Sequence, residues 1–238
     1  MNRALIWYNI KYYVETLKFI APLMVFVVFH AFIYSQRPIP IWSQYYLTAM
    51  AVFVFANWIG ASFINSEDRT QQYITRLHVK NETTYHIAKI ITILLLLMPL
   101  YALLIFYPVV FGFFVRSLLV TEVLVAVVIH FLFSLMGASV GVFFNVDFHR
   151  RETALPLLAL VIVVMVIPLD VIFHGNALVR YAVLLLPPLN FLSQRLHDLD
   201  SDVFVIDSNF LIFVLYSLGY SLILIATYVM MIQKKNKY

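Results

Sequence analysis

One short motif in this sequence resembles the surroundings of a catalytic serine. Residues 137–141 read GASVG and match the GxSxG pattern, which in hydrolases lies on a sharp turn between a strand and a helix. Here the motif lies inside the apolar run 118–144, where no such turn is expected. Gly137 and Gly141 are four residues apart, a spacing that lets two transmembrane helices approach closely. We therefore interpret Ser139 as part of a packing face, and we expect neither a catalytic residue nor an enzyme.

Two further polar side chains interrupt apolar runs. His130 lies near the middle of the run 118–144, and Asn57 lies in the run 45–64. Such residues are candidate functional positions by default. We interpret both as hydrogen-bonding groups between helices. Contact with a cargo that crosses the membrane stays open as an alternative for both residues, and a proton relay stays open for His130.

Metal and thiol chemistry find little support. The chain contains no cysteine, so disulfides and Cys-based metal sites are excluded. The histidines and acidic residues lack the tight pairing of a metal site, so we expect no metal and no other cofactor bound by this chain itself.

The longest polar stretch predicts a helix made for contact. Residues 67–89 read EDRTQQYITRLHVKNETTYHIAK. Asn65 or Ser66 can cap a helix over about 66–77, with the acids of its first turn at the positive end of the helix dipole. The polar side of this helix has no evident partner in so apolar a chain, which favours docking of a soluble protein. The predicted first turn begins with Glu67, Asp68 and Arg69, and the predicted apolar stripe consists of Thr70, Tyr73, Ile74 and Leu77.

The composition places these elements in a membrane. Of the 238 residues, 63% are hydrophobic and only 12% are charged, whereas a soluble domain has about a quarter charged residues. Apolar runs of 18 or more residues are typical of transmembrane helices. We predict one all-α membrane domain over 1–238, with six spans and no internal repeat. The spans are expected at about 18–34, 45–64, 86–111, 118–144, 153–173 and 208–232.

The Lys and Arg residues predict the orientation. With six spans, both termini lie on one side of the membrane, and that side holds twelve of the sixteen basic residues. Because basic residues collect in cytoplasmic loops, we expect both termini to lie in the cytoplasm. We expect the protein to be a multi-pass protein of a bacterial cell membrane. These twelve are Arg3, Lys11, Lys18, Arg69, Arg76, Lys80, Lys89, Arg150, Arg151, Lys234, Lys235 and Lys237. The net charge of +4 follows from this asymmetry and requires no nucleic acid as a partner.

Two shorter segments complete the expected architecture. Residues 1–18 are amphipathic, with a stripe of Ile6, Ile10, Tyr13 and Leu17, and suit a helix lying in the membrane interface. Residues 174–207 contain an apolar piece broken by two prolines, which predicts a re-entrant or interfacial segment before the last span.

The order of these elements resembles that of ABC-2 type permeases, the membrane subunits of ABC exporters. In that family a glutamate after span two begins a short helix, and a lysine opens span three. Glu67 and Lys89 occupy those places here, with Thr70, Ile74, Leu77, Thr83 and Thr84 between them. The sequence departs from the family where Arg69 precedes Thr70 and where a proline is usual near His78 or Val79. By residues, the resemblance covers about 65–89.

The resemblance implies a function. The helix at 66–77 would be a coupling helix seated in a separate ATP-binding subunit, with Glu67 and Arg69 as polar contacts and Tyr73 and Ile74 as anchors. Arg150 and Arg151 would be a secondary contact. The chain has no GxxxxGK[ST] motif, so ATP would be bound by the partner. The permease would work as a homodimer or with a sister permease, and would export an amphipathic or hydrophobic cargo, such as a peptide or a lipid-like compound.

Three other functions stay open. An integral membrane enzyme would need clustered carboxylates or histidines near the interface, which the sequence does not show. A non-transporting immunity or sensor subunit would keep the coupling helix if it too binds an ATPase. A secondary transporter would normally show repeated halves and broken spans.

Overall fold

The structure is a computed structural model that describes residues 3–35, 38–79, 81–145, 186–189, 191–192, 196, 204 and 206–235. It is all-helical in these parts, and its only extended pairing is an isolated bridge between Ile39 and Phe114. The helices are α1 (Arg3–Glu15), α2 (Ile20–Ile33), α3 (Ile41–Ile64), α4 (Arg69–Val79), α5 (Glu82–Val110), α6 (Val120–Asn145) and α10 (Ser208–Lys235).

Four of these helices, α3, α5, α6 and α10, are long and apolar enough to cross a membrane. They confirm helices at four predicted spans, although α3 begins at Ile41 and α5 at Glu82, each four residues earlier than expected. The predicted fifth span at 153–173 lies outside the described residues, as does most of the re-entrant segment. Six spans therefore stay a prediction.

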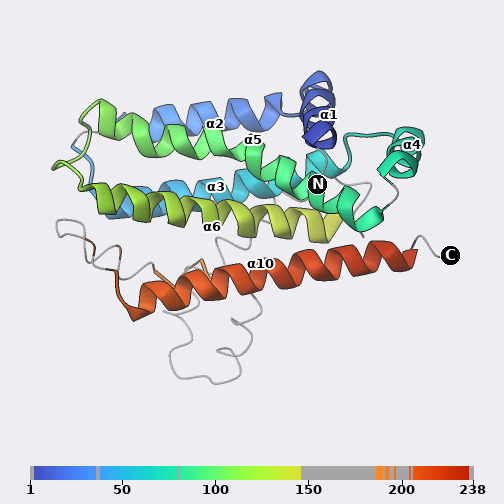
Figure 1. The fold of residues 1–238 in the computed structure, drawn as a ribbon. Coiled ribbons are helices and arrows are strands. Elements are labelled where there is room, and N and C mark those ends of the chain that lie inside the picture. The colour runs from blue at the N-terminus through green and yellow to red at the C-terminus, as the bar shows by residue number, and fades with distance from the viewer. Residues whose placement is uncertain are drawn as a thin grey trace.

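The first predicted span differs most from expectation. In place of a helix over 18–34, the structure has α2, whose 14 residues are fewer than the roughly 20 that a span needs. A turn at Thr16–Phe19 separates α2 from α1, and Leu17 there has a φ of 56°. The two helices meet at 79°, so α1 lies across one end of the bundle (Figure 1).

The face by which α1 packs also differs from the prediction. We expected a stripe of Ile6, Ile10, Tyr13 and Leu17, but α1 buries Leu5, Asn9 and Tyr13. The Tyr13 hydroxyl lies 2.7 Å from the Ser62 hydroxyl of α3, which sets this face against the bundle. Leu17 follows the end of the helix and is exposed.

Helices α3 and α6 form the most closely packed pair. A Cβ atom on Gly137 would overlap the Phe53 carbonyl, and one on Gly141 would overlap the Asn57 carbonyl. Only glycine permits this approach, so the packing interpretation of residues 137–141 is confirmed. The Ser139 hydroxyl donates to the Leu135 carbonyl one turn earlier, at 2.7 Å.

The two ends of the bundle differ in what they carry. Helices α1 and α4 and the last turn of α10 lie at one end, which we call the α4 end (Figure 1). The turn between α5 and α6 lies at the opposite end, where Arg116 forms an ion pair with Glu122 at 2.7 Å. At the α4 end, α10 joins α5 through the Tyr228 hydroxyl and the His86 ring, 3.0 Å apart.

Candidate docking site at the α4 end of the bundle

Helix α4 begins later than the sequence predicts. Arg69 is its first residue and Val79 its last, so the predicted bounds of 66–77 are wrong by two or three residues. The reason is the cap: Asp68 Oδ1 accepts from the Gln71 N–H at 2.8 Å, a bond characteristic of an N-cap residue. Asp68 therefore takes the capping role that we predicted for Asn65 or Ser66.

Glu67 precedes the helix and turns into the protein. The residue is 5% exposed, and its carboxylate lies 2.6 Å from the Nζ of Lys89, which is 2% exposed. The Tyr85 hydroxyl donates to the same carboxylate at 2.5 Å. We expected Glu67 to face a partner protein, but in the structure it faces the interior of this chain. A buried carboxylate needs a paired charge and hydrogen bonds, and Lys89 and Tyr85 supply them.

This carboxylate joins several elements of the chain. Tyr8 of α1 donates to it at 3.1 Å, and Thr75 of α4 lies 3.4 Å away. Tyr85 and Lys89 reach it from the first two turns of α5. We call these residues the Glu67 cluster: Tyr8, Glu67, Thr75, Tyr85 and Lys89.

The environment of Glu67 keeps it charged. Burial alone would raise the pKa of its carboxyl group, but the charge of Lys89 and the hydrogen bonds from Lys89, Tyr85 and Tyr8 outweigh burial and hold the pKa below its ordinary value. The Lys89 ammonium also lies 4.7 Å from the centre of the Tyr85 ring. Glu67 and Lys89 therefore form a compensated buried ion pair.

The polar side of α4 has partners within the chain, which corrects the sequence-based view. Gln71 donates through Nε2 to the Tyr8 hydroxyl at 2.8 Å, and Gln72 donates to the Glu67 carbonyl at 2.9 Å. Arg76 forms an ion pair with Glu82 at 3.8 Å. These contacts fasten α4 to the bundle by its polar residues.

The predicted apolar stripe faces outward. Tyr73 is 65% exposed, Ile74 43% and Leu77 60%, and Thr70 is exposed beside them. An amphipathic helix ordinarily buries its apolar side and exposes its polar side. Helix α4 does the reverse, and we call Thr70, Tyr73, Ile74 and Leu77 the outer face of α4.

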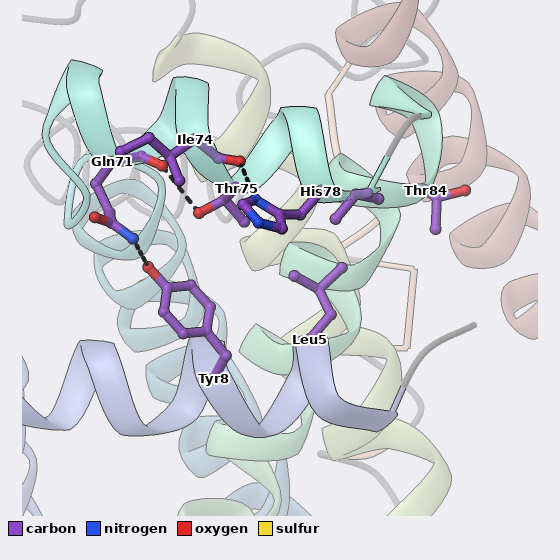
Figure 2. Close-up of a pocket in the computed structure, with 8 residues that line it drawn as sticks. Leu5, Tyr8, Gln71, Ile74, Thr75, His78 and Thr84 are labelled. Atoms are coloured by element: carbon purple, nitrogen blue, oxygen red, sulfur yellow. Dashed lines mark hydrogen bonds between the residues drawn. The ribbon is translucent and has the colours of Figure 1, made fainter.

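A pocket of about 420 Å³ lies between α1 and α4. Figure 2 shows Tyr8 and Leu5 rising from α1 toward Gln71, Thr75 and His78 on α4. The pocket was not predicted, because no sequence pattern indicates how α1 and α4 meet. Its full lining is Leu5, Tyr8, Gln71, Ile74, Thr75, His78, Val79 and Thr84.

The two polar residues inside the bundle take part in helix contacts. His130 is fully buried, and its Nε2 lies 3.0 Å from the Thr48 hydroxyl of α3, while Nδ1 lies 2.8 Å from the Ala126 carbonyl. This confirms a hydrogen bond between helices. Asn57 is fully buried where Gly141 of α6 approaches its backbone.

Three further features named from the sequence are the Ser139 motif, a possible metal site, and the pair Arg150 and Arg151. The His130 ring and the Ser139 hydroxyl bond to different partners. In the parts of the chain that the structure describes, no group of three His, Asp or Glu side chains could hold a metal ion. Arg150 and Arg151 lie outside the described residues.

The sequence-based reasoning missed the partners of Glu67. A signal was present: Lys89 lies inside the predicted span 86–111, where a charged side chain requires a partner. Three acidic residues, Glu67, Asp68 and Glu82, lie between the second and third predicted spans and were the candidates for that partner. Tyr8 and Tyr85 carried no such signal, because tyrosines are common throughout this chain.

Comparison with known proteins assigns neither a family nor a function to this chain. No family model, no curated protein and no solved structure matches this chain.

Proposed function

We propose that this chain is the membrane permease subunit of an ABC exporter, and that α4 is the helix that docks into a separate ATPase subunit. One observation carries the proposal: α4 is fastened to the bundle by its polar residues and exposes its apolar ones. A helix arranged in this way is held in place for another protein to cover.

The chemistry of the outer face suits a protein cleft. Burying a large apolar side chain is worth about 1.5–3 kcal/mol relative to leaving it exposed, and three such side chains are available here. Tyrosine is among the residues that most often dominate the binding energy of interfaces. Tyr73 is accordingly the main anchor, with Ile74 and Leu77 beside it.

The Glu67 cluster gives docking a mechanical consequence. A force on α4 reaches α5 through the Glu67–Lys89 ion pair and reaches α1 through Tyr8. Closure of an ATPase pair would therefore move α4, α1 and α5 together. Such movement biases the bundle between two arrangements, in the manner of rigid-body switching.

The rest of the proposal follows from the sequence. ATP is bound by the partner, and the permease acts as a homodimer or with a sister permease. Both termini and α4 face the cytoplasm, and the cargo is an amphipathic or hydrophobic compound exported across a cell membrane. Arg150 and Arg151 remain proposed secondary contacts. An enzymatic function is not favoured by any specific observation at Ser139 or His130.

The test is copurification with a matched control. Tyr73→Ser with Leu77→Ser removes two anchors that are exposed, so the fold should be kept. Phe111→Ser removes a comparably exposed side chain (61%) from the opposite end of the bundle. The tagged wild-type chain should retain a soluble protein with a P-loop, the double variant should lose it at least tenfold, and Phe111→Ser should keep it.

Two outcomes would overturn the proposal. Failure of the wild-type chain to retain any nucleotide-binding protein, under conditions that keep membrane complexes intact, would remove its main support. Equal retention by the double variant would show that α4 is not the docking helix. Transport of labelled cargo into vesicles then separates an exporter from a non-transporting subunit that uses the same helix.

A further inference from the structure

A buried proline interrupts α5 near the end opposite α4. Helix α5 contains Pro99 and Pro108, and Pro108 is the buried one. Proline has no N–H, and its ring pushes away the carbonyl four residues earlier in a helix. The Leu104 carbonyl therefore lacks its ordinary donor inside α5, and Leu104 is fully buried. Leaving a buried carbonyl unpaired costs free energy, so a donor from outside the helix is needed.

Two tyrosines from neighbouring helices supply donors at this point. Tyr34, the first residue after α2, donates through its hydroxyl to the Leu104 carbonyl at 2.9 Å. Tyr45 of α3 donates to the next carbonyl, that of Ile105, at 3.2 Å. Tyr34 and Tyr45 are both buried. Because neighbouring side chains can satisfy the carbonyl that a proline releases, the Tyr34 hydroxyl replaces the helix bond that Pro108 removes.

The loops at this end of the bundle are also joined by their backbones. The Ile39 N–H donates to the Phe113 carbonyl at 3.0 Å, and the Val115 N–H donates to the Ile39 carbonyl at 3.2 Å. Ile39 lies between α2 and α3, and the other two residues lie between α5 and α6. The end of α5 is therefore fastened to its neighbours on both sides of Pro108.

Pro99 provides an internal comparison within the same helix. It is exposed, and so is Leu95, whose carbonyl it releases. The hydroxyls of Tyr34 and Tyr45 bond to carbonyls beside Pro108, further along the helix. The contact between tyrosine and released carbonyl thus belongs to the buried proline.

Helices α1 and α2 are consequently joined to α5 at two distant places. At the α4 end, Tyr8 of α1 and Lys89 of α5 both bind the carboxylate of Glu67. At the opposite end, Tyr34 is bonded to Leu104. Helix α1 lies across one end of the bundle, and α2 runs from it toward the other end (Figure 1). A shift of α1 and α2 along α5 would leave a buried polar group unpaired at one end or the other.

We propose that α1, α2 and α5 form one rigid unit, which the Tyr34 hydroxyl holds together by bonding to the carbonyl that Pro108 releases. When the bundle changes shape, these three helices move together. Tyr34 is a positioning residue in this proposal, and Tyr45 supports the same bend of α5 from α3. The proposal concerns the chain by itself, so it does not depend on docking of an ATPase.

The first test is a double-mutant cycle on the purified full-length chain in detergent. Tyr34→Phe keeps the ring that packs against Tyr107, with 5.7 Å between ring centres, and removes only the hydroxyl. The midpoint of thermal unfolding should fall by about 2–6 °C, because the Leu104 carbonyl loses its donor. Together with Pro108→Ala, whose N–H can bond to that carbonyl, Tyr34→Phe should shift the midpoint by less than about 1 °C.

Pro99→Ala is the matched control for the cycle. It restores an N–H at a different turn of α5, so Tyr34→Phe should keep its full effect in that background. Equal shifts from Tyr34→Phe in the wild-type, Pro99→Ala and Pro108→Ala backgrounds would show that the hydroxyl does not replace the bond that Pro108 removes, and would overturn the proposal.

The second test measures the rigidity of the unit. The chain contains no cysteine, so Val28→Cys and Leu103→Cys can carry one spin label each on α2 and α5. Both positions are exposed, at 65% and 46%. The distribution of distances between the labels should be narrow in the otherwise unchanged chain and roughly twofold broader with Tyr34→Phe, because loss of the bond makes local opening easier.

Two results of the second test would overturn the rigid unit. One is a broad distribution in the otherwise unchanged chain, and the other is an equal width with and without Tyr34→Phe. Tyr73→Ser, which lies in the proposed ATPase contact, should leave the distribution narrow. The rigid unit and the docking role of α4 can therefore fail separately.

Discussion

Two buried glutamates, one at each end of the bundle, are both paired with a cation but in different ways. At the α4 end, Glu67 is bound by side chains from α1, α4 and α5, and its cation Lys89 is as buried as the acid. At the opposite end, Glu122 is bound by Arg116, six residues earlier, whose side chain is 26% exposed. Glu67 joins separate helices, whereas Glu122 mainly shapes one turn.

The geometry of Glu122 supports this local role. Arg116 donates to both carboxylate oxygens, at 2.7 and 2.8 Å, in the two-pronged arrangement that favours arginine. The Leu119 N–H donates at 2.9 Å, so the acid also caps the start of its own helix. In the described part of the chain it also accepts a bond from a distant residue, the Phe204 N–H, at 3.4 Å. The elements that we propose to move together, α1, α4 and α5, are therefore joined at Glu67, whereas Glu122 mainly holds the turn before α6.

Breaking the Glu67 pair should have the largest effect. Lys89→Met removes the buried cation and leaves a buried carboxylate without its charge partner, which is expected to lower the free energy of unfolding by about 3–5 kcal/mol. Thermal unfolding of the purified variant in detergent measures the loss.

The control for Lys89→Met is the double variant with Glu67→Gln. Tyr8 donates to Oε1 of Glu67 and Tyr85 to Oε2, so the amide oxygen keeps one of these bonds and the other tyrosine hydroxyl must turn to accept from the amide N–H. No buried charge is left, so the double variant should recover much of the lost stability. If it is as unstable as Lys89→Met alone, the charge of Glu67 is not the cause.

Removing the charge of Glu122 should have a smaller effect. Glu122→Gln weakens two charged hydrogen bonds, but Arg116 is partly exposed and can turn to water, so about 1–3 kcal/mol is expected. The same unfolding assay applies. A loss as large as that of Lys89→Met would contradict the distinction between a joining acid and a local one.

The sequence predicted the long helices well, because runs of apolar residues determine them directly. It predicted ends and caps less well. Asp68, and neither Asn65 nor Ser66, caps α4 by accepting from the Gln71 N–H at 2.8 Å, and all three residue types are good caps. Choosing among neighbouring candidates requires backbone geometry that the sequence does not state.

The candidate site shows a second limit. Tyr73, Ile74 and Leu77 were found as one stripe from their spacing alone, but spacing does not say whether a stripe faces the bundle or away from it. The direction was decided by contacts between distant residues, such as Gln71 with Tyr8 and Thr75 with Glu67. Such contacts follow from the tertiary arrangement of α1 and α4, which no local pattern encodes.

The smallest expected effect is on the pH dependence of the free energy of unfolding, which should change only in acid. The pKa of Glu67 is lowered in the folded chain, chiefly by Lys89 against the opposing effect of burial, so the unfolded chain binds a proton at higher pH than the folded chain does. The stabilisation by this charge is therefore fully present above the unfolded pKa of about 4.3 and is lost as the pH falls through the lower folded pKa.

The measurement is the free energy of unfolding from pH 7 to pH 3. The contribution of Glu67 to it should be constant down to about pH 4.5 and should fall below that pH. The Glu67→Gln variant should lack the part of the acid decline that belongs to this group. If wild type and variant decline in parallel below pH 4.5, Glu67 is not held ionised by Lys89, and the ion pair would not be what joins α5 to the Glu67 cluster.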